Sequence, residues 1–219
     1  MNRPVKNESV ILLHGLIRSS ASFNKMAADF RSEGYHIVNV DYPSRQFSIE
    51  ELASKYIGDA IDECLLQGSE VIHFVTHSMG GILVRYYLSK NTLNELGHVV
   101  MLGPPNQGSE LVDKLGGLPG FSMIHGPAGI QLGTSRESVP AKLGKVDYPV
   151  GVIAGNRSIN MFLSMIIPGE DDGKVSVERT RLTGMTDFLV VPHTHPMMMR
   201  SNEVITQVKC FLEKGMFSQ

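Results

Sequence analysis

The sequence predicts a single α/β domain with a mainly parallel sheet of about six strands and helices on both faces. Short apolar runs rich in β-branched residues alternate along the chain with longer amphipathic stretches, as expected for strands joined by helical crossovers. The strand candidates are nearly continuous apolar runs, which is typical of a sheet that is buried on both faces. The length of 219 residues suits one domain of this class and is short for two.

The elements follow one another in a regular order. The predicted strands are residues 9–13, 35–40, 71–76, 99–102, 150–154 and 188–191. The predicted helices are residues 21–33, 48–67, 79–90 and 201–214, whose apolar side chains recur at helical spacing. We expect Ser20 or Ser22 to cap the first helix and Gly34 to end it.

Two stretches interrupt this alternation. Residues 103–147 are dense in glycine and proline, with no predicted strand and only weak helical periodicity. Residues 156–170 contain a strongly apolar run, 159–167, which is expected to fold as a helix. We expect both stretches to be cap-like insertions within a single domain that comprises residues 1–219.

Composition and charge exclude several classes of function. With 20 basic and 22 acidic side chains the formal net charge is −2, so no basic excess is available for binding a nucleic acid. No apolar run approaches the length of about 18 residues that suggests a membrane span. The apolar stretch 10–13 is too short for the core of a signal peptide, which predicts a cytoplasmic protein. Cys64 and Cys210 are far apart without a CxxC pattern, so we expect free thiols.

The strongest motif is a strand that continues into a helix through a serine, in the sequence Val71-Ile-His-Phe-Val-Thr-His-Ser-Met-Gly-Gly81. Gly80 and Gly81 permit a tight turn, which would place Ser78 Oγ at the carboxyl edge of the sheet. The backbone N–H of Met79, at the start of the helix, would point at an oxyanion with the helix dipole behind it. This context is typical of a serine nucleophile.

At this motif the chain resembles the α/β-hydrolase superfamily, and within it the small bacterial lipases and esterases. The family's pentapeptide is G-x-S-x-G, and Thr76 replaces its first glycine here. His14-Gly15, after the first strand, resembles the family's oxyanion segment, so Leu16 N–H is expected to be the second oxyanion donor beside Met79 N–H. The resemblance implies a reduced α/β-hydrolase sheet, because the few residues before the first strand leave no room for the family's usual antiparallel hairpin.

The acid of the triad is expected in residues 169–177, which resemble the D-G-x-V stretch of these lipases. Asp172 is preferred because it directly precedes Gly173, whose flexibility lets the backbone turn the carboxylate inward. Asp171 is the alternative, and either residue would also suit an Asx turn in a solvated loop. Asp147 and Asp187 precede their strands and are expected at the opposite edge of the sheet.

The triad histidine is expected in the loop after the last strand, where His195-Pro-Met-Met198 matches the family's H-x-x-[ML] spacing. His193 is the alternative. The His193-x-His195 pair would also suit two metal ligands, but no further cluster of ligands in the sequence completes such a site, and no metal is expected. The histidines expected to be structural are His14, His73, His77, His98 and His125.

The resemblance implies a serine hydrolase that cleaves carboxylic esters through an acyl-enzyme. Ser78 would be the nucleophile, His195 the base, and Asp172 the group that orients the imidazole, in the chain order of the superfamily. No cofactor, nucleic acid or obligate protein partner is expected. The substrate is expected to be a small-molecule ester with an apolar acyl group, and a lipid interface stays open. The alternatives are a thioesterase or acyltransferase with the same triad, or a non-catalytic ligand-binding protein with this fold.

Overall fold

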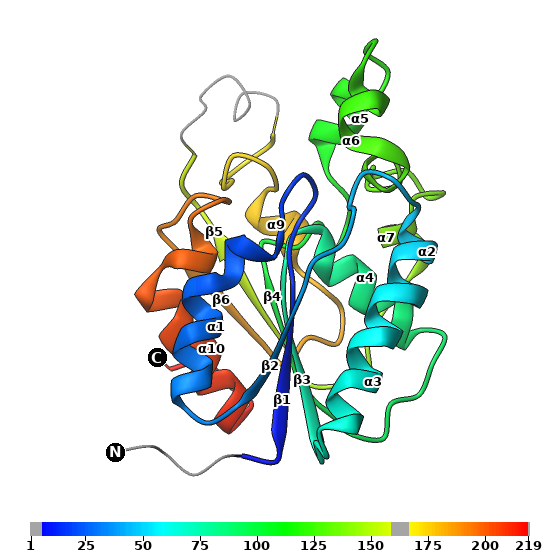
Figure 1. The fold of residues 1–219 in the computed structure, drawn as a ribbon. Coiled ribbons are helices and arrows are strands. Elements are labelled where there is room, and N and C mark those ends of the chain that lie inside the picture. Colours follow the sequence, from blue (N-terminus) through cyan, green and yellow to red (C-terminus); the bar gives the residue numbers. More distant parts are fainter. Residues whose placement is uncertain (1–5, 159–166, 219) are drawn as a thin grey trace.

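The computed structural model describes residues 6–158 and 167–218, in which a six-stranded sheet lies between two layers of helices (Figure 1). The strand order is β2-β1-β3-β4-β5-β6, and all the pairings between neighbouring strands are parallel. The predicted parallel sheet is therefore confirmed; the largest difference from the predicted bounds is at β4, which begins at Leu96. The strands are β1 (Glu8–Leu13), β2 (His36–Val40), β3 (Val71–His77), β4 (Leu96–Leu102), β5 (Val150–Gly155) and β6 (Asp187–Val191).

The order of the strands reverses between β1 and β3. After β1 the chain moves to the edge strand β2, then returns to the other side of β1 and continues outward through β3, β4, β5 and β6. Leu13 pairs with Thr76, and His77 with Leu102, so these three strands end almost level. In open parallel sheets, ligands bind at the carboxyl ends of the strands where the order reverses. The residues that follow β1 and β3 are therefore placed together at this switch point.

Alternate side chains of β1 pack against opposite layers of helices. Val10 and Leu12 belong to one buried core cluster, and Ile11 and Leu13 belong to the other. Burial of both faces explains why the strand sequences are continuously apolar. One layer contains α1 (Asn24–Ser32) and α10 (Asn202–Lys214), and the other contains α2 (Ile49–Leu52), α3 (Gly58–Leu66) and α4 (Met79–Leu88).

Two of the predicted helices differ in detail. The helix expected over residues 48–67 is α2 and α3 joined by a π-helical turn, η2 (Ala53–Ile57). The first helix begins as a short 3-10 turn, η1 (Ser20–Phe23), without a side-chain cap, so the predicted serine caps are wrong. Ser20 N–H instead donates to Asp41 Oδ1 at 2.9 Å, and its carbonyl accepts from Asn39 Nδ2 at 3.0 Å. Tertiary contacts to the end of β2 thus define where this helix starts.

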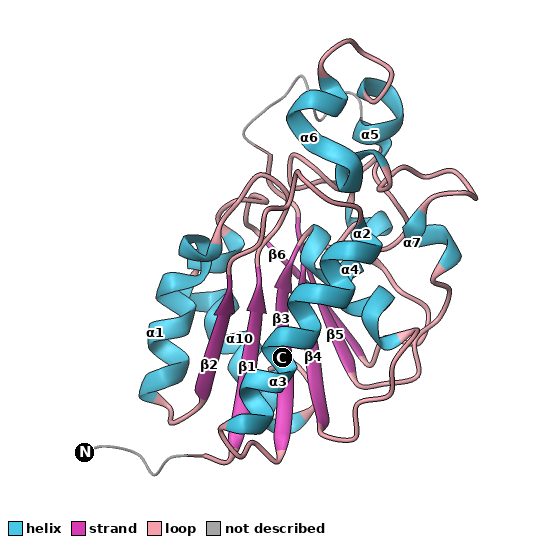
Figure 2. Cartoon of the chain, turned by 45° about the vertical axis from the view of Figure 1, so that its right-hand side comes forward, coloured by secondary structure: helices cyan, strands magenta, loops and turns pink. Residues whose placement is uncertain are grey.

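The glycine-rich insertion between β4 and β5 is more helical than predicted. It contains α5 (Glu110–Leu115), α6 (Phe121–Ile130) and α7 (Val139–Lys142), and Figure 2 shows α5 and α6 above the carboxyl ends of the strands. Gly126, with φ 66°, and Pro127 interrupt α6. Segments this short do not build up a clear hydrophobic period, which is why the sequence predicted irregular structure.

Beyond the insertion between β4 and β5, two further short helices of the described residues were not predicted, namely α9 (Val177–Thr180) and η3 (Met198–Arg200). Most of the apolar run 159–167, expected to be a helix of the second insertion, lies outside the described residues. Among the helices that the structure describes, none has the length and apolar character needed to cross a membrane. Cys64 and Cys210 are both free, as predicted.

Candidate active site

Ser78 occupies a sharp turn between β3 and α4. Its backbone angles are φ 54° and ψ −122°, a conformation that a non-glycine residue keeps only when its surroundings impose it. Ser78 N–H donates to the carbonyl oxygen of Leu102 at 2.8 Å, and Gly81 N–H donates to the carbonyl oxygen of Ser78 at 3.0 Å. A Cβ at Gly80 would lie 2.5 Å from the carbonyl oxygen of Leu13. Close packing against β1 and β4 therefore holds the strained serine at the carboxyl edge of the sheet.

Asp172 and His195 form a buried, hydrogen-bonded pair. His195 Nδ1 donates to Asp172 Oδ2 at 2.6 Å, and the backbone N–H of His195 donates to the carbonyl oxygen of Asp172 at 2.9 Å. The other carboxylate oxygen, Oδ1, accepts from the backbone N–H groups of Lys174 and Val175, both at 2.9 Å. Both oxygens of Asp172 are thus engaged, so the imidazole is held in one orientation with Nε2 as its other nitrogen.

Two glycines at strand ends make room for this pair. Gly103 follows β4 with φ 54°, and a Cβ there would lie 2.9 Å from Asp172 Oδ2 and 3.1 Å from His195 Nδ1. Gly155 ends β5, and a Cβ there would lie 3.0 Å from Asp172 Cβ and 2.4 Å from the carbonyl oxygen of His193. The edge of the sheet is therefore shaped to fit the acid and the histidine.

The two alternatives considered from the sequence have other partners. Asp171 Oδ1 accepts from the backbone N–H of Gly173 at 2.7 Å, which is an Asx turn. His193 Nε2 lies 2.9 Å from Glu203 Oε2 and 2.9 Å from Ser201 Oγ. The histidines of the His-x-His sequence thus contact separate groups. The described part of the chain contains no group of three or more His, Cys, Asp and Glu side chains placed to hold a metal ion.

The residues that carry the two expected oxyanion donors, Leu16 and Met79, lie close to Ser78. Met79 is the first residue of α4, where backbone N–H groups have no partner within the helix. Gly15 is packed against the serine, because a Cβ at Gly15 would lie 3.0 Å from Ser78 Cβ. Leu16 follows Gly15 and borders the same cavity as Ser78. Ile17 has φ 59° and is a second strained backbone position that borders the same cavity as the serine.

Ser78 and His195 border a cavity of about 420 Å³ at the edge of the sheet. Within the described residues no hydrogen bond joins their side chains, a contact that in many hydrolases tightens only when substrate is bound. One rim consists of residues 15–18, and Lys174 and Val175 also border the cavity. Seven further lining residues come from the insertion between β4 and β5: Pro105, Ser109, Leu111, Val112, Phe121, His125 and Leu132. The insertion therefore supplies most of the apolar wall.

His77 has a closer relation to the site than the sequence suggested. Its Nε2 donates to the carbonyl oxygen of His195 at 2.9 Å, and the centres of the two rings are 4.5 Å apart. Burial lowers the pKa of His77 well below its usual value, and the charge of His195 lowers it further. His77 is therefore a neutral side chain that supports the loop carrying His195. Its position directly before Ser78 was the only signal for this role in the sequence.

Comparisons with known proteins agree with this architecture. A family model described as alpha/beta hydrolase fold matches residues 8–120. No curated protein sequence is similar enough to count as a match.

Several solved structures are similar in fold. The mature form of lipase BlEst2 from Bacillus licheniformis superposes with a TM-score of 0.75 at 21% identity, covering 98% of this chain and 96% of the other. Phospholipase PlaB from Legionella pneumophila superposes with a TM-score of 0.64 at 20% identity, covering 80% of this chain and 45% of the other. The RedJ thioesterase of Streptomyces coelicolor superposes with a TM-score of 0.58 at 15% identity, covering 98% of this chain and 89% of the other. At these identities the likeness concerns the fold alone.

Proposed function

Because a family model matches more than half of its length, the chain belongs to the α/β-hydrolase fold family, and we propose that it is a serine hydrolase that cleaves carboxylic esters. The observation that carries this proposal is the 2.6 Å hydrogen bond between His195 Nδ1 and Asp172 Oδ2, in a cavity that His195 shares with the strained Ser78. The structures of similar fold are named as a lipase, a phospholipase and a thioesterase, which supports acyl transfer as the reaction class.

In this proposal Ser78 Oγ attacks the ester carbonyl while His195 Nε2 accepts the proton of the hydroxyl. Asp172 fixes the tautomer, because its carboxylate accepts from Nδ1–H and leaves Nε2 free to act as a base. It also stabilises the imidazolium that forms in the transition state. His195 then protonates the departing alcohol, and water hydrolyses the acyl-enzyme by the same sequence of steps.

The negative charge of the tetrahedral intermediate would be stabilised by two backbone N–H groups, those of Leu16 and Met79. Fixed donors of this kind lower the barrier by about 2.7–4 kcal/mol each in a well-studied serine protease. The strained backbones at Ile17 and Ser78 are consistent with a loop and a turn that are held in place before substrate binds.

The acyl group would lie in the cavity beneath α5 and α6. Its walls include Leu111, Phe121 and Leu132, which favour an apolar chain. A volume of about 420 Å³ suits a chain of moderate length. We therefore propose that monomeric esters of short and medium acyl chains are substrates.

Kinetics on p-nitrophenyl butyrate and octanoate test the proposal. Ser78→Ala is expected to lower kcat on the order of 10⁶-fold, as for a triad serine. Asp172→Asn is expected to lower it on the order of 10⁴-fold, because the wrong tautomer of the imidazole is stabilised. Circular dichroism spectra of the variants check that the fold is kept.

Asp171→Asn and His193→Gln are the matched controls, since each changes the same residue type one or two positions away. Both are expected to keep most of the activity, because their side chains contact Gly173, Glu203 and Ser201. A wild-type protein without esterase activity, or a full loss of activity in either control with Asp172→Asn and His195→Ala still active, would contradict the assignment.

A further inference from the structure

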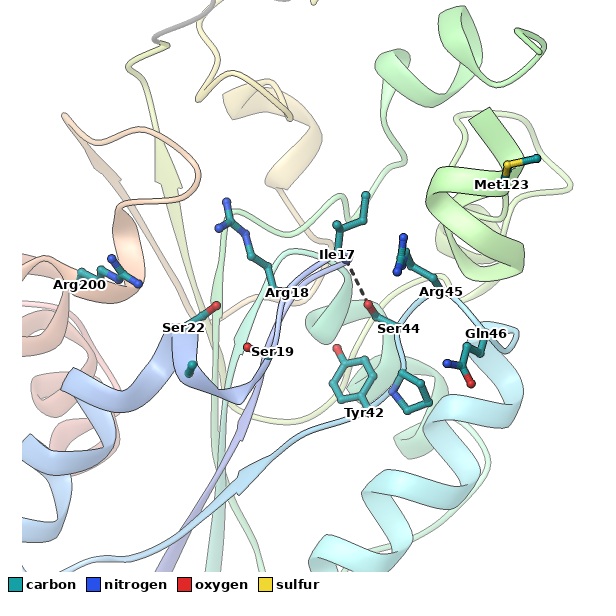
Figure 3. A pocket seen from close by; sticks show the side chains of 12 residues that line it. Ile17, Arg18, Ser19, Ser22, Tyr42, Ser44, Arg45, Gln46, Met123 and Arg200 are labelled. Atoms are coloured by element: carbon teal, nitrogen blue, oxygen red, sulfur yellow. Dashed lines mark hydrogen bonds between the residues drawn. The ribbon is translucent and has the colours of Figure 1, made fainter. Parts of the chain in front are cut away.

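A second cavity, of about 820 Å³, adjoins the candidate active site and is lined by three arginines. Figure 3 shows Arg18, Arg45 and Arg200 around it, on three segments that are distant in the sequence. Arg18 follows β1, Arg45 follows β2, and Arg200 ends η3. No aspartate or glutamate is among the described residues that line this cavity. The formal charge of the whole chain is −2, so the positive charge here is a local feature.

The three guanidinium groups have no acidic partner in the described part of the chain. Other arginines do: Arg179 Nε donates to Glu110 Oε1 at 2.7 Å, and Arg181 lies 3.3 Å from Glu178. The acidic residue nearest in sequence to the cavity, Asp41, accepts from Ser20 N–H. Like charges gathered without counter-charges raise the local potential and attract anions.

The backbone on which these arginines stand is fixed by close contacts. Ile17 N–H donates to Ser44 Oγ at 3.1 Å, which joins the loop after β1 to the loop after β2 (Figure 3). At Gly126 of α6, a Cβ would lie only 1.9 Å from the carbonyl oxygen of Arg45, so this loop and the helix are in tight contact. Lys25 Nζ donates to the carbonyl oxygen of Arg200 at 2.8 Å and adds a further positive charge. These contacts therefore hold the backbone near the three arginines in place.

The arginine-lined cavity shares lining residues with the candidate active site. Ile17 and Arg18 border both this cavity and the one that contains Ser78 and His195. The helix α6 also contributes to both, with Met123 in the first and Phe121 in the second. A molecule whose carbonyl lies at Ser78 would therefore extend along the 15–18 loop into the positive cavity.

Resting on the proposed esterase function, we propose that the substrates are acyl esters whose alcohol portion carries a phosphate group, which Arg18, Arg45 and Arg200 bind. Guanidinium groups donate paired hydrogen bonds to phosphate oxygens, a geometry that a neutral ester does not satisfy. The acyl chain occupies the apolar cavity. Ser78 Oγ bonds to the carbonyl carbon, the bond from that carbon to the alcohol oxygen breaks, and His195 transfers the serine proton to the departing phosphate-bearing alcohol.

A matched pair of substrates with one acyl chain tests this. The ratio of kcat/KM for 1-octanoyl-glycerol 3-phosphate to that for 1-octanoylglycerol is measured below the micellar concentration. In wild type this ratio is expected to exceed one and to fall as salt screens the charges. In the double variant Arg45→Gln/Arg200→Gln it is expected to fall at least about tenfold, because two charge-assisted contacts are lost. Arg31→Gln, an exposed arginine of α1 that lines neither cavity, is expected to leave the ratio unchanged.

The source of the phosphate is distinguished by inhibition. Glycerol 3-phosphate as the better inhibitor of wild type indicates a glycerolipid and supports the proposal. Coenzyme A as the better inhibitor indicates a thioester carrier, whose leaving group is a thiol, and contradicts the proposal of a phosphate-bearing alcohol. Inhibition by neither compound at millimolar concentration contradicts it, as does a ratio that is the same in wild type and the double variant.

Failure of this inference can be separated from failure of the esterase proposal. If the neutral ester is hydrolysed but the ratio does not respond to the arginine variants, only the phosphate site is wrong. If neither ester is hydrolysed, the esterase proposal is wrong, and calorimetric binding of 1-octanoyl-glycerol 3-phosphate to Ser78→Ala still tests the phosphate site. Affinity at least about tenfold weaker with the two arginine substitutions added supports it, and equal affinity overturns it.

Discussion

The turns beneath the candidate active site differ in packing from residues 117–120, which form the tip of the cap, the insertion between β4 and β5. Beneath the site, glycines lie so close to their neighbours that no side chain fits: at Gly80 a Cβ would lie 2.5 Å from a backbone oxygen, and at Gly103 it would lie 2.9 Å from Asp172 Oδ2. In the cap, a Cβ at Gly117 or at Gly120 would point into open space, with no described neighbour within 4 Å. Apolar side chains of the cap are also open to solvent, with Met123 85% exposed.

This difference indicates that the fold fixes the positions of the candidate catalytic side chains, whereas the residues of the cap can vary. The serine directly follows β3, and the acid and the histidine pack against glycines at the ends of β4 and β5, so their geometry depends on the sheet. The cap supplies seven of the residues that line the cavity. Changes in the first region should therefore abolish chemistry, whereas changes in the cap should alter which acyl chain is preferred.

Among the substitutions that test this comparison, Gly103→Ala should have the largest effect. The new Cβ would lie near the contact between Asp172 and His195, at a backbone φ of 54° that alanine disfavours. Displacement of the pair by a fraction of an ångström is expected to lower kcat on the order of 10²-fold. Esterase kinetics measure the loss of kcat, and a thermal melt measures the loss of stability caused by alanine at the disfavoured φ.

Gly117→Ala is the matched control. Its site is open and its φ is not in the left-handed region, so alanine should leave kcat unchanged and stabilise the chain by about 0.4–1 kcal/mol through the unfolded state. Equal activity of the two alanine variants would contradict the difference drawn between the two regions.

A fall in pH should lower the free energy of unfolding, because the histidines buried around the sheet bind protons more readily in the unfolded chain. Burial lowers the pKa values of His14, His73 and His77, so each is neutral in the folded protein when the unfolded chain begins to bind protons near pH 6.5. Stability is then fully present above that pH and is lost as the pH falls, by up to about 1.4 kcal/mol per pH unit for each histidine. Free energies of unfolding at pH 7.5, 6.0 and 5.0 measure the slope.

His73→Asn tests one contribution to that slope. Asparagine keeps an acceptor for His98 N–H, which donates to His73 Nδ1 at 2.9 Å, and removes the titrating group. Glu8, His98 and Lys6 face His73, and only the first favours its protonation. The variant should lose stability less steeply with acid than wild type. Equal slopes of the free energy of unfolding against pH in the variant and in wild type would show that His73 does not contribute to the loss of stability in acid.

A smaller effect is expected from Phe121→Ala in the cap. Phe121 is 7% exposed, stacks on His125 with ring centres 4.0 Å apart, and borders the cavity proposed for the acyl group. Its loss should lower kcat/KM for the octanoate ester about tenfold and change the butyrate ester much less. Ile124→Ala, on the same helix but 53% exposed and outside both cavities, is the control. An equal loss for both esters would assign Phe121 a structural role only.

The sequence predicted the sheet better than the cap, for a physical reason. Each strand contains a short, mostly apolar run that is followed by a glycine, a proline or a polar residue, so the pattern can be recognised without tertiary information. In the cap, Gly120, Gly126 and Pro127 break the chain into helices too short to show a period. The 3-10 start of the first helix depends on Asp41 and Asn39, which are distant in sequence from the serines that were expected to cap it.

Prediction of the candidate site from the sequence had the same limit. Ser78, Asp172 and His195 were chosen from their place after strands and from neighbouring glycines, and the structure brings Asp172 and His195 into contact. The arginine-lined cavity was not predicted, because Arg18, Arg45 and Arg200 lie in three segments that are distant in the sequence. No local pattern marks residues that only the strand order brings together.

Labelling with a fluorophosphonate probe, followed by mass spectrometry of the peptides, tests the central claim most directly, since only an activated serine reacts with the phosphorus. We expect one adduct per native chain, on Ser78, and none on Ser78→Ala or on the unfolded wild type. Labelling of another serine in native wild type, undiminished labelling of folded Ser78→Ala, or no adduct on the native protein would contradict it.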